Sequence, residues 1–165
     1  MPRLLGFALE LSGQQLGALT VAFVLAQGLL NLGYGLIADR RGFRVSFLLG
    51  LAVWIAAALM LLTADGFGQV LVGFVGLGAG VGGFMMSGQN LVLEFGSRAN
   101  LPMRIAVANS ASELVGVVAP ILGGVLAAAF SYPLLIAVAV GFKVLAFAVT
   151  LFWVDEPRHR SQQPL

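Results

Sequence analysis

The stretch Gly35-Leu-Ile-Ala-Asp39-Arg40-Arg41-Gly42-Phe43-Arg44 decides the fold of this chain. It places one acid and three bases within ten residues, and a long apolar run lies on each side of it. Apolar runs of this length are typical of helices that cross a bilayer. The stretch is therefore predicted to be a short, water-exposed loop between two consecutive spanning helices.

The composition of the chain also points to lipid as its solvent. Of the 165 residues, 59% are apolar and only 10% are charged, with a mean hydropathy of +0.99, whereas a soluble domain carries about 25% charged residues. No basic patch has interleaved aromatic residues, so nucleic acid is not an expected partner. Cys is absent and the single His, His159, lies in the polar tail. No metal site and no cofactor are therefore predicted.

Five apolar segments are long enough to span a membrane. Their residues do not alternate as those of barrel strands do, and helices satisfy their own backbone groups in lipid. The predicted fold is all-α, a polytopic transmembrane bundle of five helices. The predicted spans are 15–37, 45–62, 67–93, 105–130 and 133–154, with a segment 1–14 before them and a tail 155–165 after them. Ser12 and Gln15 predict a capping box at the start of the first helix.

Basic residues lie in alternate connections, which predicts the direction of the spans. These residues are Arg40, Arg41, Arg44, Arg98, Arg104, Arg158 and Arg160. Since bases favour the cytoplasm, we expect a cell-membrane protein with its N-terminus outside and its 155–165 tail in the cytoplasm. The first segment could insert with an external N-terminus by itself, but for an odd number of spans we expect that something upstream is missing.

Two sequence patterns resemble those of the major facilitator superfamily of secondary transporters. The first loop resembles the family's signature loop, although Phe43 stands where the family usually has a base. The run Gly116-Val-Val-Ala119-Pro120-Ile-Leu-Gly123-Gly124 resembles the family's Gly-Pro-x-x-Gly-Gly pattern, with Ala119 in place of a glycine. The two patterns lie three helices apart, as in the family. The resemblance covers nearly the whole chain and implies the C-terminal half of a transporter, helices eight to twelve, without helix seven.

This resemblance implies secondary active transport of a small solute by alternating access, not an enzyme. It also implies a missing N-terminal half or a partner chain, with a proton as a candidate coupling ion and no substrate named. The predicted gating hinge is Gly35, Asp39, Arg40, Gly42 and Arg44. In this hinge Asp39 would accept hydrogen bonds from a helix N-terminus and pair with Arg44, and Gly35 would let a second helix approach. The alternative is a charged anchor that fixes topology and never changes partner.

Polar residues inside the spans are candidates for a solute or ion pathway. Glu113 and Lys143 lie at similar depths, so they could meet as an ion pair, in which Glu113 would bind a proton or face a polar substrate and Lys143 would tune the pKa of Glu113. Alternatively, Lys143 snorkels and Glu113 lies near headgroups or a local water. Gln27 and Asn31 share a helix face. These two residues and Asn109 are predicted to line a cavity or, alternatively, to form ordinary bonds between helices. Gln89 and Asn90 are placed nearer the interface, and Trp54 falls in mid-span.

The glycine-rich run Gly78-Ala-Gly80-Val-Gly82-Gly83 matches a dinucleotide-binding pattern by chance, because no strand precedes it. The spacings Gly76/Gly80 and Gly78/Gly82 predict close helix packing instead. Pro120 predicts a kink, and Gly123 and Gly124 predict tight packing beside it.

The alternative to a transporter is a small non-transporting membrane protein that acts as an assembly or regulatory partner. An enzyme is not expected, since no nucleophile and base are paired in the sequence.

Overall fold

The computed structural model describes residues 11–94, 100–130 and 132–154. Most of the segment 1–14, the tail 155–165 and Arg98 lie outside these ranges. The helices are α1 (Gly13–Arg41), α2 (Phe43–Leu62), α3 (Phe67–Glu94), α4 (Leu101–Ala129) and α5 (Tyr132–Trp153). Each has a stretch long and apolar enough to cross a membrane. The predicted class, an all-α bundle of five spanning helices, is confirmed.

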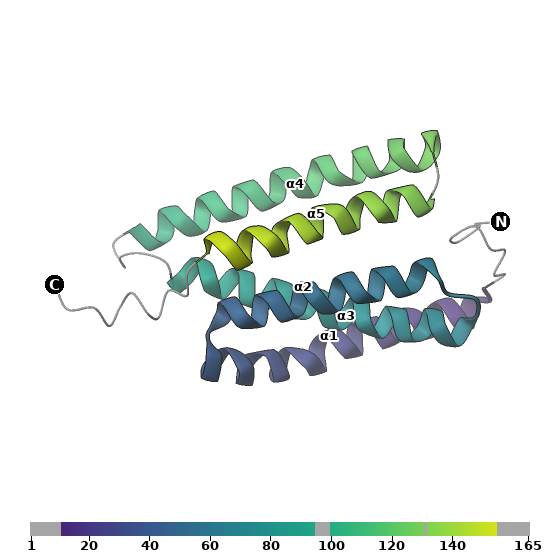
Figure 1. Ribbon diagram of the computed structural model, residues 1–165, viewed down its shortest axis with the longest axis horizontal. Coiled ribbons are helices and arrows are strands. Elements are labelled where there is room, and N and C mark those ends of the chain that lie inside the picture. The colour runs from purple at the N-terminus through teal and green to yellow at the C-terminus, as the bar shows by residue number, and fades with distance from the viewer. Residues whose placement is uncertain (1–10, 95–99, 131, 155–165) are drawn as a thin grey trace.

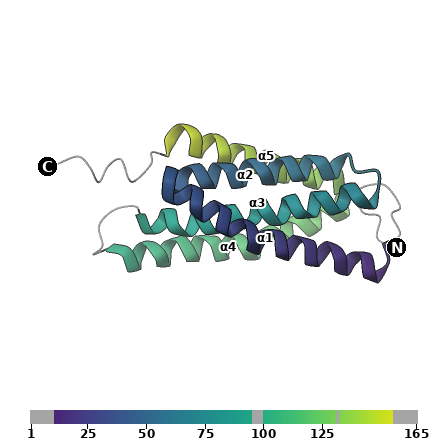
Figure 2. The same cartoon turned by 90° about the horizontal axis from the view of Figure 1, so that it is seen from below.

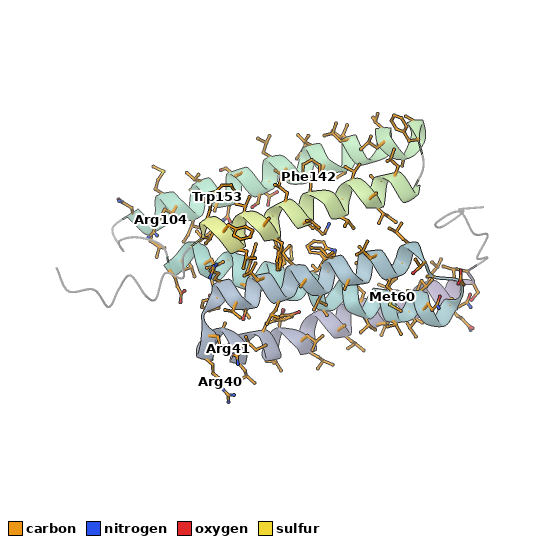
Figure 3. The ribbon with its side chains drawn as sticks, viewed as in Figure 1. Arg40, Arg41, Met60, Arg104, Phe142 and Trp153 are labelled. Carbon is orange, nitrogen blue, oxygen red and sulfur yellow. The ribbon has the colours of Figure 1, made fainter. Side chains whose placement is uncertain are left out.

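The five helices run side by side along one direction (Figures 1 and 2). At one end of the bundle α1, α3 and α5 end and α2 and α4 begin. Arg40, Arg41 and Arg104 lie at this end, opposite Met60 (Figure 3). We call it the basic end. Helices α1 to α4 extend past their predicted spans here because a hydropathy pattern stops at the first charged turn, whereas the hydrogen-bonded helix continues through it. Helix α5 ends at Trp153, one residue before its predicted end.

The N-terminus of α1 has the predicted capping box. The Ser12 N–H donates to Gln15 Oε1 at 2.9 Å, and the Gln15 N–H donates to Ser12 Oγ at 3.3 Å. This exchange satisfies two of the backbone donors that a helix start leaves open. Nearby, Leu19, Leu61 and Val70 are buried together in an apolar cluster at the end opposite the basic end.

Helix α3 is the centre of the bundle and packs closely on both α1 and α2. A Cβ atom added to Gly76 would lie 2.8 Å from the Ala57 Cβ, and one added to Gly80 would lie 2.6 Å from the backbone of Trp54. A Cβ atom on Gly78 would run into the carbonyl oxygen of Phe23. The glycine-rich run is therefore a close-packed surface on two sides of one helix.

Helices α4 and α5 form the outer part of the described bundle (Figure 1). Helix α5 packs on α2, and α4 packs on α3 and α5. No described residue of α4 is buried. Pro120 lies inside α4, and Gly124 has open space around it, while a Cβ atom on Gly123 would meet Leu135 at an ordinary 3.9 Å. The tight packing predicted at these two glycines is not formed within the described residues, since Gly123 meets α5 only at an ordinary contact distance and nothing lies close to Gly124.

Candidate hinge and solute path

The connection between α1 and α2 is a single buried residue, Gly42. Its backbone has φ 89° and ψ 159°, and its N–H donates to the Ala38 carbonyl at 2.8 Å. This backbone region is essentially restricted to glycine, because a Cβ atom would clash there. The sharp turn at the predicted hinge thus depends on Gly42 itself.

Arg44, in the first turn of α2, reaches across to the end of α5. Its Nε donates to the Thr150 carbonyl at 3.3 Å and its Nη2 donates to the Leu151 carbonyl at 2.6 Å. Carbonyl groups in the last turn of a helix lack intrahelical partners and carry partial negative charge, which a guanidinium stabilises. Arg44 therefore ties α2 to α5 at the basic end.

The other residues of the predicted hinge, Gly35, Asp39 and Arg40, lie in α1. Asp39 and Arg40 are exposed on the last turn of α1. The pairing of Asp39 with Arg44 stays a prediction. Gly35 contacts α3 only loosely, since a Cβ atom there would meet the Met86 methyl at 4.0 Å. The bond from Arg44 to α5 was missed in the sequence, because the partners are more than 100 residues apart and the acceptors are backbone atoms.

A cavity of about 310 Å³ lies between α3 and α4, toward the basic end. Its polar side chains are Gln89, Asn109 and Ser112, and the rest of its lining is apolar or glycine. The sequence placed Asn109 on a cavity and Gln89 nearer the interface, but the structure brings both to one cavity. The described residues thus offer uncharged hydrogen-bonding groups on an otherwise apolar wall.

Glu113 continues the polar face of α4. Glu113 lies four residues after Asn109 and Ser112 lies three residues after it, so each of the two is a neighbour of Asn109 on the helix surface. All three are exposed. A carboxylate at this place in a spanning helix is a candidate for proton binding.

Gln27 and Asn31 of α1 are directed at α3. A Cβ atom on Gly82 would lie 2.7 Å from Asn31 Oδ1 and 3.3 Å from Gln27 Cγ. Both side chains are half-buried, and Asn31 Oδ1 is buried without a hydrogen-bond partner among the described residues. Their role in lining a cavity stays a prediction, and the contact that the structure gives them is with the glycine surface of α3.

Lys143 does not pair with Glu113 within the described part of the chain. Its Nζ lies 4.3 Å from the centroid of the Trp54 ring, on α2. The side chain faces α2 because α5 packs mainly on that helix, while Glu113 is exposed on α4. The sequence held a signal for this contact: Trp54 and Lys143 each lie roughly 15 Å from the basic end of their helices.

The fold and these features define a multi-pass membrane protein with a charged hinge and polar side chains between its spanning helices. Residues 1–165 match the Major Facilitator Superfamily, so the chain belongs to that family of transporters, whose members are not enzymes. The chain is similar to Multidrug resistance protein D of Escherichia coli (strain K12), with 28% identity over 147 residues. The match covers 84% of this chain and 37% of that relative, so the chain spans less than half of the relative's length.

Proposed function

We propose that this chain forms part of a secondary active transporter that moves a small solute by alternating access. The observation that carries the proposal is the family match over residues 1–165. The chain would supply helices eight to twelve, and an N-terminal half or a partner chain would supply the rest. In this family-type mechanism two helical bundles rock around a site near the middle of the membrane.

Open faces on two helices support a second bundle. Cβ atoms added to Gly17 and Gly28 of α1, or to Gly116 and Gly124 of α4, would meet nothing within 4 Å. Small residues on a spanning helix let another backbone come close. Together with the exposed side chains along α4, these faces are suited to cover by the rest of a transporter.

The α3–α4 cavity supports a solute that is largely apolar and carries hydrogen-bonding groups. Gln89, Asn109 and Ser112 would bond such groups, and the surrounding lining would contact the apolar part. Glu113 would bind the coupling proton beside them. Because the relative is a multidrug resistance protein, drug-like compounds with apolar and hydrogen-bonding parts are the first solutes to test.

The hinge would act at the cytoplasmic face, with the basic end inside the cell and the N-terminus outside. Here Asp39 would bond a helix N-terminus of the other bundle in one conformation and release it in the other. Arg44 would keep α2 and α5 together during this exchange, since its hydrogen bonds to the Thr150 and Leu151 carbonyls join two helices of this chain.

Transport by the reconstituted protein tests the proposal. The chain is incorporated into vesicles together with its upstream or partner segment, and uptake of a fluorescent amphipathic dye is followed with and without a proton gradient. We expect Glu113→Gln to reduce gradient-driven uptake about tenfold, equivalent to about 1.4 kcal/mol. Ser110→Ala, at an exposed position of α4 outside the cavity lining, is the matched control. Uptake that is equal in wild type and Glu113→Gln would remove Glu113 from the pathway.

A second candidate function is that of a non-transporting assembly or regulatory partner. The DNA upstream of the codon for Met1 separates the two. An in-frame extension encoding about seven further spans supports the transporter, whereas a start codon with its own ribosome site supports the partner or a half-transporter that assembles with another chain.

A further inference from the structure

Lys143 makes its one described polar contact with an aromatic ring inside the membrane-spanning part of the bundle. The Nζ atom lies 4.3 Å from the centroid of Trp54, well within the range of about 6 Å in which an ammonium is attracted to the face of an indole. Lys143 itself is half-buried. Among the described residues of α2 and α5 there is no acid that could neutralise it, so the ring takes the place of a counter-ion.

Trp54 in turn contacts residues of α3. Its ring lies edge-on to Phe84, with centroids 5.5 Å apart and planes at 70°, and Phe84 in turn contacts Phe47 at 4.9 Å. Gly80 packs directly against the backbone and Cβ of Trp54. Trp54 is therefore held between a cation on α5 and the glycine surface of α3.

No described residues of α3 and α5 pack directly on one another; α2 lies between them. The arrangement Lys143–Trp54–Phe84 is thus a side-chain link from α5 to α3 through α2. The same helix α3 continues to Gly88 and Gln89 in the cavity lining. A shift of the Trp54 ring would consequently displace α3, the helix that supplies half of the lining of the candidate solute path.

We propose that Lys143 is a positioning residue: its charge fixes the Trp54 ring against Gly80 and Phe84 and so holds α3 in place, without contact to the solute. This assignment removes Lys143 from the ion pathway. It concerns the position of a helix, so it stands or falls separately from solute transport.

The test uses the emission of Trp54 and a melting-temperature cycle. In a Trp153→Phe background Trp54 is the remaining tryptophan, because the chain has only two. We expect Lys143→Met to change the intensity and maximum of Trp54 emission and to lower the melting temperature of the purified protein by about 2–4 °C. Lys143→Arg, which keeps a cation, restores both readouts. In a Trp54→Leu background the same Lys143→Met change lowers the melting temperature by less than half as much.

Phe142→Leu, at the neighbouring exposed position of α5, controls for general effects of altering that helix and should leave Trp54 emission unchanged. The proposal is overturned if Lys143→Arg and Lys143→Met give the same emission spectrum. It is also overturned if the full melting shift persists in the Trp54→Leu background. Should Lys143→Met fail to accumulate, two other comparisons decide in its place. A cation–π contact predicts that the Trp54 emission spectrum of Lys143→Arg is the same as that of the wild type. It also predicts that Trp54→Phe lowers the melting temperature by less than Trp54→Leu does.

Discussion

At the scale of single residues, the turn between α1 and α2 depends on Gly42. It is the only residue between two long helices, it is buried, and its φ of 89° is one that other residues rarely adopt. The bases beside it can be explained by topology alone, but the glycine cannot. Its conformation directs α2 back along α1 and brings Arg44 to the carbonyl groups that end α5.

Gly42→Ala is expected to destabilise the folded protein by about 1–3 kcal/mol, because the added Cβ would be held in a strained backbone region. The measurement is the midpoint of thermal or denaturant unfolding of the purified protein. Gly68→Ala is the matched control, since Gly68 is exposed in the first turn of α3 with open space around it. Equal midpoints for the two variants would show that the turn tolerates a side chain.

At the scale of elements, α3 holds the bundle together. Its glycines let α1 and α2 approach on two sides, and contacts to Phe23, Ala57 and Trp54 leave no room for a Cβ atom. Lipid gives spanning helices little reason to associate by burial of apolar surface alone, so close packing of this kind contributes much of the attraction between them.

Gly80→Ala should lower the free energy of unfolding by about 1–3 kcal/mol, because the methyl group would overlap the backbone of Trp54 and force α2 and α3 apart. Unfolding in graded denaturing detergent measures the loss. Gly141→Ala, in α5 with nothing within 4 Å of the added Cβ, provides the comparison and should be neutral or slightly stabilising. A Gly80→Ala protein as stable as Gly141→Ala would contradict the close packing of these helices.

At the scale of the whole molecule, the two ends of the bundle differ in charge. The α1–α2 turn, the end of α3, the start of α4 and the end of α5 lie at the basic end, whereas Asp65 lies in the α2–α3 turn at the other end. We predict the direction in which this bundle crosses the membrane from the charge difference between its ends, with the basic end in the cytoplasm. This direction also determines on which side a hinge at Asp39 would act.

Single cysteines test that direction cleanly, since the chain contains no native Cys. In intact cells we expect Asp65→Cys to react with a membrane-impermeant maleimide and Arg41→Cys to react only after permeabilisation. Both residues are exposed, so each should be reachable from its own side. Labelling of Arg41→Cys in intact cells would show that the bundle has the opposite topology, with the hinge outside the cell.

The sequence by itself determined the class of this protein. Hydropathy and length are local properties, so five spans, the capping box at Ser12 and the turn at Gly42 could be predicted without knowing any long-range contact. The two family patterns could be recognised because a turn or a packed helix face requires glycine or proline at particular positions, and these positions recur at constant spacings in the sequence. For the same reason the spacing of Gly76 and Gly80 indicated a packing surface.

Only the tertiary structure decided which side chains meet. The contact of Lys143 with Trp54 rather than Glu113, the bonds from Arg44 to α5, and the shared cavity of Gln89 and Asn109 all depend on which helices are neighbours and how each is rotated. Helices in lipid are nearly uniform in apolar character around their circumference, so the pattern of one helix does not reveal the face it turns to another. Rotation and neighbours are set by packing of the whole bundle, and that packing selects the partner of every polar group within it.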